Sequence, residues 1–230
     1  MLSKKKFFIF FILWGAVIFS SASTLYPSEY FDLSNYKLQY PGPSEQTDLS
    51  NFTSQYFYSL KPKTMTFFIN ASSTGHTVNS DYVRSELRHL SNWYVSESAE
   101  IQATLRVDSK LTPSKITVMQ IHGETKTLAN APPLLRIAVN NGSLYAFIKS
   151  STSNSNSEKI LLENDVNNNQ FTCKINIFKD IISIWVNGEL CVQKKISYWG
   201  YLNYFKVGAY PQAHEGWAKV TVYDLTADVY

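Results

Sequence analysis

The stretch IQATLRV, residues 101 to 107, alternates apolar and polar side chains without a break. In an extended chain, successive side chains point to opposite faces, so its apolar residues share one face: Ile101, Ala103, Leu105 and Val107. A helix would scatter the same residues around its circumference. The stretch therefore predicts a β-strand with one buried face, and the fold class depends on how often this pattern returns.

The same alternation returns several times along the chain. It is present at Ile116 and Val118 and over residues 135–139, 175–177 and 182–186. Hairpin turn signals follow two of these runs, at Asn141-Gly142 and Asn187-Gly188, and Lys179-Asp180 is a third candidate turn. No long helix and no internal repeat is evident after about Pro27. Many short strands joined by polar turns predict an all-β fold, an antiparallel β-sandwich or jelly roll.

The region that follows the N-terminal segment shows no domain boundary. The Ser/Asn-rich residues 150–157 are flanked by strands of one type, which favours a surface loop over a linker. Residues 32–56, with Pro41-Gly42-Pro43, are predicted to form an irregular lead-in with one short helical turn. We therefore expect a single domain over residues 23–230.

The N-terminal segment has the three parts of a secretory signal. Three lysines at residues 4–6 precede an apolar run from Phe7 to Phe19, and small residues follow at 20–23. The run is short for a membrane span, so cleavage near Ala22 is favoured over a retained anchor. Residues 1–22 are thus predicted to be a signal peptide. The mature protein would be secreted, or periplasmic in a bacterium, with no membrane association.

Removal of that segment leaves no net charge to attract nucleic acid. The full chain has 21 Lys and Arg against 18 Asp and Glu, and three of the lysines lie in the signal segment. The mature chain therefore balances 18 against 18. An anionic partner has to be held by a local cluster of cations, and nucleic acid is not expected as a partner.

The two cysteines leave alternatives open. In an exported protein, Cys173 and Cys191 would by default form a disulfide. If the predicted turns are correct, however, a strand separates the two, and two strand spacings of about 9 to 10 Å exceed the reach of a disulfide. Asn51, Asn70 and Asn141 begin sequons that would carry glycans only in a eukaryotic secretory pathway.

Two segments place demanding polar groups at alternate positions. In RSELR, residues 84–88, Arg84, Glu86 and Arg88 share a face, where Glu86 could hold both guanidinium groups while each offers donors to a ligand carboxylate. A purely structural ion-pair ladder is the alternative. In MQIHG, residues 119–123, Gln120 and His122 share a face, although a lone strand histidine is more often structural.

A third segment, YFKVGAY at residues 204–210, continues the pattern. Its polar face either only contacts solvent or forms the floor of a site. Gly208, in the middle of that face, would open room for a ligand. The residues of the face are Tyr204, Lys206, Gly208, Tyr210 and Gln212. Together the three segments supply Arg, Gln and Lys for an anion, and His and Tyr for proton transfer. That set suits β-elimination on a uronic acid polymer, where neutralising the carboxylate makes the C5 proton removable. The four histidines show no metal-ligand spacing, so no metal is expected.

These segments also carry a family resemblance. RSELR, QIH and YFKVGAYPQ resemble, in order, the three signature blocks of the alginate lyases of polysaccharide lyase family 7. The resemblance implies a concanavalin-like β-jelly roll of two curved sheets with a concave groove. It implies that Arg84 and Gln120 neutralise the substrate carboxylate, that His122 is the general base, and that Tyr210 is the general acid and in some substrates also the base. It gives substrate-positioning roles to Glu86, Arg88, Tyr204, Lys206 and Gln212.

The leading hypothesis is a secreted, monomeric, endo-acting alginate lyase without metal or cofactor. Pro211 departs from the family pattern and indicates an edge, a bulge or the end of strand pairing. A lyase on another polyuronate such as glucuronan is the first alternative, since all polyuronates share the carboxylate and the C5 proton. A non-catalytic carbohydrate-binding jelly roll is the second. A glycoside hydrolase is disfavoured, because the row at 84–88 supplies only one of the two carboxylates required.

Overall fold

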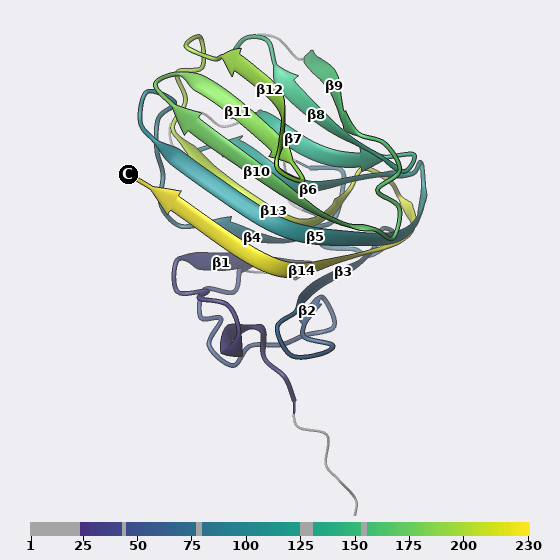
Figure 1. Ribbon diagram of the computed structural model, residues 1–230. Helices are drawn as coiled ribbons and strands as arrows, with labels where there is room; N and C mark the ends of the chain where they lie inside the picture. Colours follow the sequence, from purple (N-terminus) through teal and green to yellow (C-terminus); the bar gives the residue numbers. More distant parts are fainter. Residues whose placement is uncertain (1–23, 43–44, 77–79, 125–130, 153–155) are drawn as a thin grey trace, which may run out of the picture.

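Two antiparallel sheets of seven strands each form the molecule (Figure 1). The computed structural model describes residues 24–42, 45–76, 80–124, 131–152 and 156–230. The predicted signal segment lies outside these residues. No helix in the described part of the chain has the length and apolar character needed to cross a membrane. The prediction of an all-β sandwich is confirmed.

The first sheet carries all three segments singled out in the sequence. Its strands are, in spatial order, β1 (Tyr36–Gln39), β4 (Ser85–His89), β13 (Asn203–Pro211), β6 (Lys115–Gly123), β7 (Pro133–Asn140), β8 (Ser143–Lys149) and β9 (Ser157–Glu163). Strand β13 lies between β4 and β6, although the chain reaches it last of the three. This order brings the three segments side by side at one place on the sheet.

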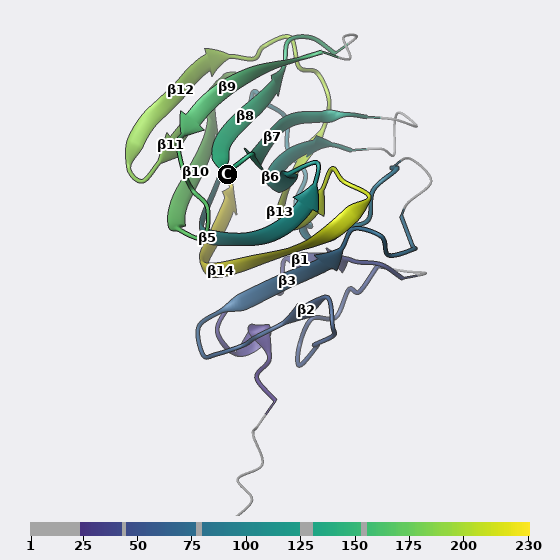
Figure 2. The same cartoon turned by 90° about the vertical axis from the view of Figure 1, so that its right-hand side faces the viewer.

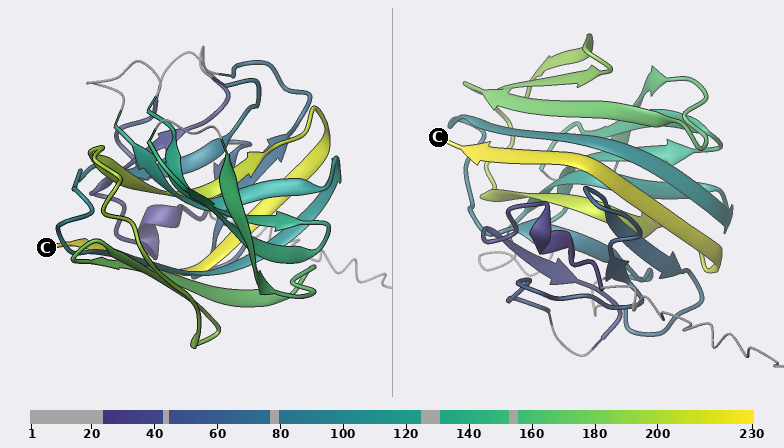
Figure 3. Two further views of the ribbon diagram at one scale, coloured as in Figure 1. Left: turned by 90° about the horizontal axis from the view of Figure 1, so that it is seen from above. Right: turned by 60° about the horizontal axis from the view of Figure 1, so that its bottom comes forward.

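The second sheet packs face to face with the first, and its strands bend along their length (Figure 2). Its strands are, in spatial order, β12 (Glu189–Lys195), β11 (Ile181–Val186), β10 (Gln170–Phe178), β5 (Ala99–Thr112), β14 (Glu215–Val229), β3 (Met65–Asn70) and β2 (Phe57–Tyr58). The long β5 and β14 pair along nearly their whole length and form its centre, as both views of Figure 3 show.

The core lies between the sheets and uses the alternation seen in the sequence. On β5, Ile101, Ala103 and Leu105 are fully buried. The first sheet meets them with apolar residues from its own inner face, including Leu87 and Ile121, which are also fully buried. Burial of one such aliphatic side chain contributes about 1.5 to 3 kcal/mol. On each strand of the first sheet, the residues that alternate with these core residues must point away from the second sheet. The polar residues of the three segments therefore lie on this face, which we call the outer face of the first sheet.

The predicted hairpin turns are present. Asn141-Gly142 joins β7 to β8 with φ of 50° and 85°, and Asn187-Gly188 joins β11 to β12 with φ of 51° and 88°. Lys179-Asp180 joins β10 to β11, also with positive φ at both residues. Two consecutive positive φ values define the turn whose twist matches that of paired strands. The strands on either side of the Ser/Asn-rich residues, β8 and β9, are neighbours in one sheet.

The strand order also settles the state of the cysteines. Cys173 is on β10 and Cys191 on β12, with β11 between them, and both are free thiols. The prediction from strand spacing is confirmed, and the disulfide alternative is wrong. Burial raises the pKa of the Cys173 thiol to about 12, and its neighbour Cys191 adds to that shift, so Cys173 stays protonated in the core.

The lead-in segment differs from its prediction. The short helical turn is a 3-10 helix at Pro27–Glu29, before residue 32, and the region predicted to be irregular contains strand β1. Tyr36 and Leu38 are buried while Lys37 is half-buried, which is the alternation of a strand, but four residues are too few to stand out in the sequence. Strand β1 covers the edge of β4.

Gly208 does not provide the open space that the sequence suggested. A Cβ at this position would lie 2.4 Å from the Ser85 carbonyl oxygen and 2.7 Å from the Glu86 Cα, and the φ of Gly208 is +148°. Val207 pairs with Met119 but Tyr210 with Thr117, so a β-bulge lies between them. Glycine is therefore required because β4 approaches closely and the bulged backbone has an unusual conformation.

We predict that Gly208→Ala lowers stability by about 2 kcal/mol or more, because it combines backbone strain with a clash against β4. Thermal unfolding should shift downward by about 4 to 8 °C. Gly200→Ala is the matched control, since Gly200 is exposed and its added Cβ would meet nothing within 4 Å. Equal melting temperatures for the two variants would contradict this account of Gly208.

Candidate active site

A fully buried carboxylate forms the centre of the outer face of the first sheet. The two Glu86 oxygens divide between two neighbours: Oε1 accepts a 2.5 Å hydrogen bond from the Gln120 amide, and Oε2 a 2.5 Å hydrogen bond from the Lys206 ammonium. Strand register produces this grouping, because Lys206 on β13 pairs with Gln120 on β6, and Gly208 pairs with Glu86 on β4. Gly208 lets the β4 backbone approach β13 closely at Glu86, since a Cβ there would lie 2.7 Å from the Glu86 Cα.

Charge pairing keeps this centre ionised. Burial alone would raise the pKa of Glu86, but Lys206 and then Arg84 hold it below its usual range. Burial lowers the pKa of Lys206 to about 8, against the opposing effect of Glu86. At neutral pH the carboxylate and the ammonium therefore both carry their charges, and the pair is held by charge-assisted hydrogen bonds.

Arg84 and Tyr210 form one flank of this centre. The Arg84 guanidinium carbon lies 4.4 Å from the centre of the Tyr210 ring, and Nη1 lies 3.6 Å from Oε2 of Glu86. Arg84 Nε is buried and has no hydrogen-bond partner among the described residues. The Tyr210 hydroxyl is 2.9 Å from the hydroxyl of Ser80. Arg84 is thus fixed in position by stacking and by charge while donors remain for an anion.

His122 and Tyr204 form the other flank. Their rings stack at 5.4 Å with an interplanar angle of 18°. Nδ1 of His122 lies 2.9 Å from the carbonyl oxygen of Gly123, which can only accept, so Nδ1 carries the proton and Nε2 is the free base. Burial, followed by the charges of Lys206 and Arg84, lowers the pKa of His122 to about 4. Burial raises the pKa of Tyr204 to about 12. His122 is therefore neutral at pH 7.

Arg88 has a different partner from the one expected. Glu86 does not hold it; its Nη2 donates to the Glu124 carboxylate at 2.6 Å and to the Asn92 side chain at 3.0 Å. Lys206 and Gln120 already occupy the two oxygens of Glu86. The Arg88 guanidinium carbon lies 4.0 Å from the centre of the Tyr204 ring. Arg88 therefore supports the Tyr204 ring, which in turn stacks on His122.

Gln212 is turned into the protein. Its amide oxygen accepts a 3.0 Å hydrogen bond from Thr117, and its amide nitrogen donates to the Tyr210 carbonyl oxygen. Pro211 is the last residue of β13, which matches one of the three predicted alternatives, the end of strand pairing. The structure thus brings together every other predicted site residue around Glu86, whereas Gln212 fastens the end of β13 beside Tyr210.

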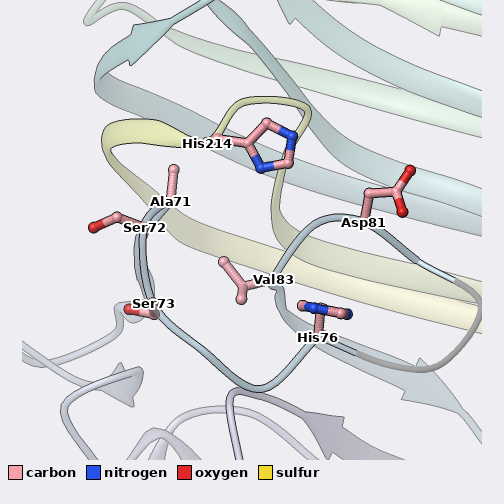
Figure 4. A pocket seen from close by; sticks show the side chains of 7 residues that line it. All are labelled: Ala71, Ser72, Ser73, His76, Asp81, Val83 and His214. Atoms are coloured by element: carbon pink, nitrogen blue, oxygen red, sulfur yellow. The ribbon is translucent and has the colours of Figure 1, made fainter.

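A pocket of about 520 Å³ adjoins the Tyr210 flank (Figure 4). It is formed by the β3–β4 connection and the loop before β14, and its lining residues are Ala71, Ser72, Ser73, His76, Asp81, Val83 and His214. The Tyr82 ring lies 4.9 Å from the His214 ring and 6.3 Å from the Tyr210 ring, so it joins this pocket to the site. Within the described ranges, no group of three His, Cys, Asp or Glu side chains is placed to hold a metal ion.

Three residues that contact or adjoin the site were not predicted from the sequence. Glu124 and Ser80 are in loops, where period-2 alternation gives no signal, and only the tertiary fold brings them to Arg88 and Tyr210. Arg136 pairs with Gln120 across β6 and β7. A signal for Arg136 did exist, since the apolar alternation of residues 135–139 places it on the outer face.

Solved alginate lyases share this architecture. Alginate lyase A1-II′, a member of polysaccharide lyase family 7, matches with a TM-score of 0.81 at 28% identity over 88% of this chain and 98% of that one. A substituted form of that enzyme in complex with substrate (GGMG) matches with a TM-score of 0.83 at 27% identity, over 90% and 97%. An alginate lyase from Corynebacterium sp. shares the fold, with a TM-score of 0.74 at 22% identity, over 90% and 99%.

A comparison with curated protein sequences finds no match. The family model described as alginate lyase, in contrast, matches residues 31–229, which is most of the chain, and the protein therefore belongs to the alginate lyase family.

Proposed function

We propose that the protein cleaves alginate by β-elimination at the site centred on Glu86. One observation carries the proposal: Arg84, Gln120, His122 and Tyr210 gather around one buried, ion-paired carboxylate from three different strands or their ends. Family membership supports the substrate, as does the related enzyme whose structure contains GGMG. A pure binding module would have no need of the proton-transfer pair.

The substrate carboxylate would be held by Arg84 and Gln120. Arg84 retains donors, including Nε, and Gln120 uses one of its two amide hydrogens on Glu86. Their hydrogen bonds would withdraw charge from the carboxylate and stabilise the enolate-like charge that develops as C5 loses its proton. Glu86 itself would stay off the substrate, because both of its oxygens are already engaged.

The proton transfers fall to His122 and Tyr210, on opposite flanks of the centre. Nε2 of His122 takes the C5 proton, the electrons of that C–H bond form the C4=C5 double bond, and the C4–O bond breaks. Tyr210 gives its hydroxyl proton to the departing oxygen. A bound uronate carboxylate next to His122 would also raise the pKa of the imidazole, which makes it a stronger base when substrate is present.

We further propose endo action, export and a monomeric state. The row of site residues crosses the strands of an open sheet face, so a polymer could bind without presenting its end. Export is supported by the lysines, the apolar run and the small residues of the first 23 positions. Endo action would be seen as a rapid fall in alginate viscosity while few new chain ends have formed.

We predict that His122→Asn and Tyr210→Phe each lower kcat on alginate by about 10³-fold, because each removes a proton-transfer group. The measurement is the ultraviolet absorbance of the unsaturated uronate product. Tyr204→Phe is the matched control, since it keeps the ring between Arg88 and His122 and removes only a hydroxyl, so its loss should stay within about tenfold.

Substantial activity in a folded His122→Asn or Tyr210→Phe protein would contradict the assigned roles. A panel of polyuronates assayed beside alginate would identify a glucuronan-type substrate. Binding of alginate with no unsaturated product from the unmodified protein would instead identify a carbohydrate-binding module.

We predict that His122 titrates near pH 4 in the free protein, well below an ordinary histidine at about 6.5. Because the depressed pKa favours the neutral ring, the base remains available as pH falls and is lost only as pH passes through about 4. Nuclear magnetic resonance of the ring protons measures this directly, with His122→Asn identifying the signal. A midpoint near pH 6.5 would refute the inferred environment.

A further inference from the structure

The site residues belong to a longer row that crosses the first sheet. Gln120 on β6 pairs with Arg136 on β7, Arg136 with Phe147 on β8, and Phe147 with Lys159 on β9. Residues paired in this way point to the same face, so all of them lie on the outer face with Gln120. Three strand spacings carry the row about 14 Å from the catalytic centre.

Cations and aromatic rings alternate along this extension. Lys115 Nζ lies 4.4 Å from the centre of the Phe147 ring, and Lys159 Nζ lies 4.0 Å from that of the Tyr145 ring. Burial lowers the pKa of Lys115, and the charges of Arg136 and Lys159 lower it further, so the three cations share one field. We call Lys115, Arg136 and Lys159 the cationic strip.

The cationic strip has no salt-bridge partner in the part of the chain that the structure describes. Strand β9 has two carboxylates. Glu158, next to Lys159, is bonded to Lys194 of the second sheet, and Glu163 at the end of the strand accepts from the backbone N–H of Asn164. Lys115 and Arg136 are half-buried and Lys159 is exposed, so a ligand can reach all three.

The other end of the sheet is different. There Lys37 on β1 pairs with Glu45, and Arg88 on β4 pairs with Glu124. At the centre, Lys206 pairs with Glu86. Lys37, Arg88 and Lys206 are therefore compensated by the protein itself, whereas the three cations of the strip form no salt bridge within the described residues.

We infer that the cationic strip binds the carboxylates of sugars on one side of the scissile bond, the side over β7 to β9. This inference rests on the proposed function, since it places the same polymer on the same sheet. Lysine and arginine bind carboxylates through charge-assisted hydrogen bonds, and the half-buried sites of Lys115 and Arg136 are screened less by salt than exposed ones. On the β1 side the polymer would be held without net charge from the protein.

The test is the triple variant Lys115→Gln, Arg136→Gln, Lys159→Gln. Its KM for alginate at low ionic strength should rise about tenfold or more, with kcat within about threefold, because the strip contacts sugars away from the reacting bond. Added salt should raise the KM of the unmodified enzyme steeply and that of the triple variant only weakly.

Two controls isolate the strip. Lys110→Gln, Lys179→Gln, Lys195→Gln makes the same charge change at exposed lysines of the second sheet and should leave KM unchanged. Lys37→Gln removes a compensated cation at the opposite end of the first sheet and should also leave KM unchanged. The single variant Lys159→Gln, at an exposed position, should still raise KM if the triple variant fails to fold.

The outcomes separate this inference from the proposed function. If the unmodified protein does not cleave alginate, the proposed function is wrong, and the inference with it. If it cleaves alginate but the strip variants keep its KM and salt dependence, only the inference is overturned. An equal rise in KM for both triple variants would also overturn it, because net charge and not the strip would then be responsible.

Discussion

The buried Glu86 carboxylate is the constraint on which the rest of the site depends. An ionised group that is shielded from solvent needs an opposite charge or hydrogen-bond donors in direct contact with it. Lys206 on β13 and Gln120 on β6 provide these for Glu86. Once Glu86 has fixed their side chains, Arg84 and Tyr210 lie on one flank and His122 and Tyr204 on the other. In the proposed mechanism, the catalytic groups are thus positioned by a charge that takes no part in the chemistry.

The sequence predicted the layers of the fold and the direction of most side chains, because period-2 alternation is a local property. Ile101, Leu105 and Ile121 are in the core, and Gln120 and His122 face outward, as expected. The identity of pairing partners was not predictable. Arg88 bonds Glu124, and Glu86 bonds Lys206, residues distant in sequence whose meeting depends on strand order.

Gly208 shows the same limit in another way. The sequence suggested that the missing side chain opens room for a ligand, whereas the structure places the β4 backbone there. The alternation of the segment gives no sign of the bulge between Val207 and Tyr210, and the neighbouring β4 backbone cannot be placed from the local sequence. In both cases the missing information is which strand lies beside which.

The position of β13 in the first sheet also determines when the sheet can form during synthesis of the chain. Strands β4 and β6 are complete by residue 123, but β13, which separates them, begins only at residue 203. Until β13 has emerged, the first sheet lacks the strand between β4 and β6, and two edges with polar groups remain unpaired. Non-local pairings of this kind form slowly. An emerging chain therefore has neither a continuous first sheet nor the grouped site residues until β13 is in place.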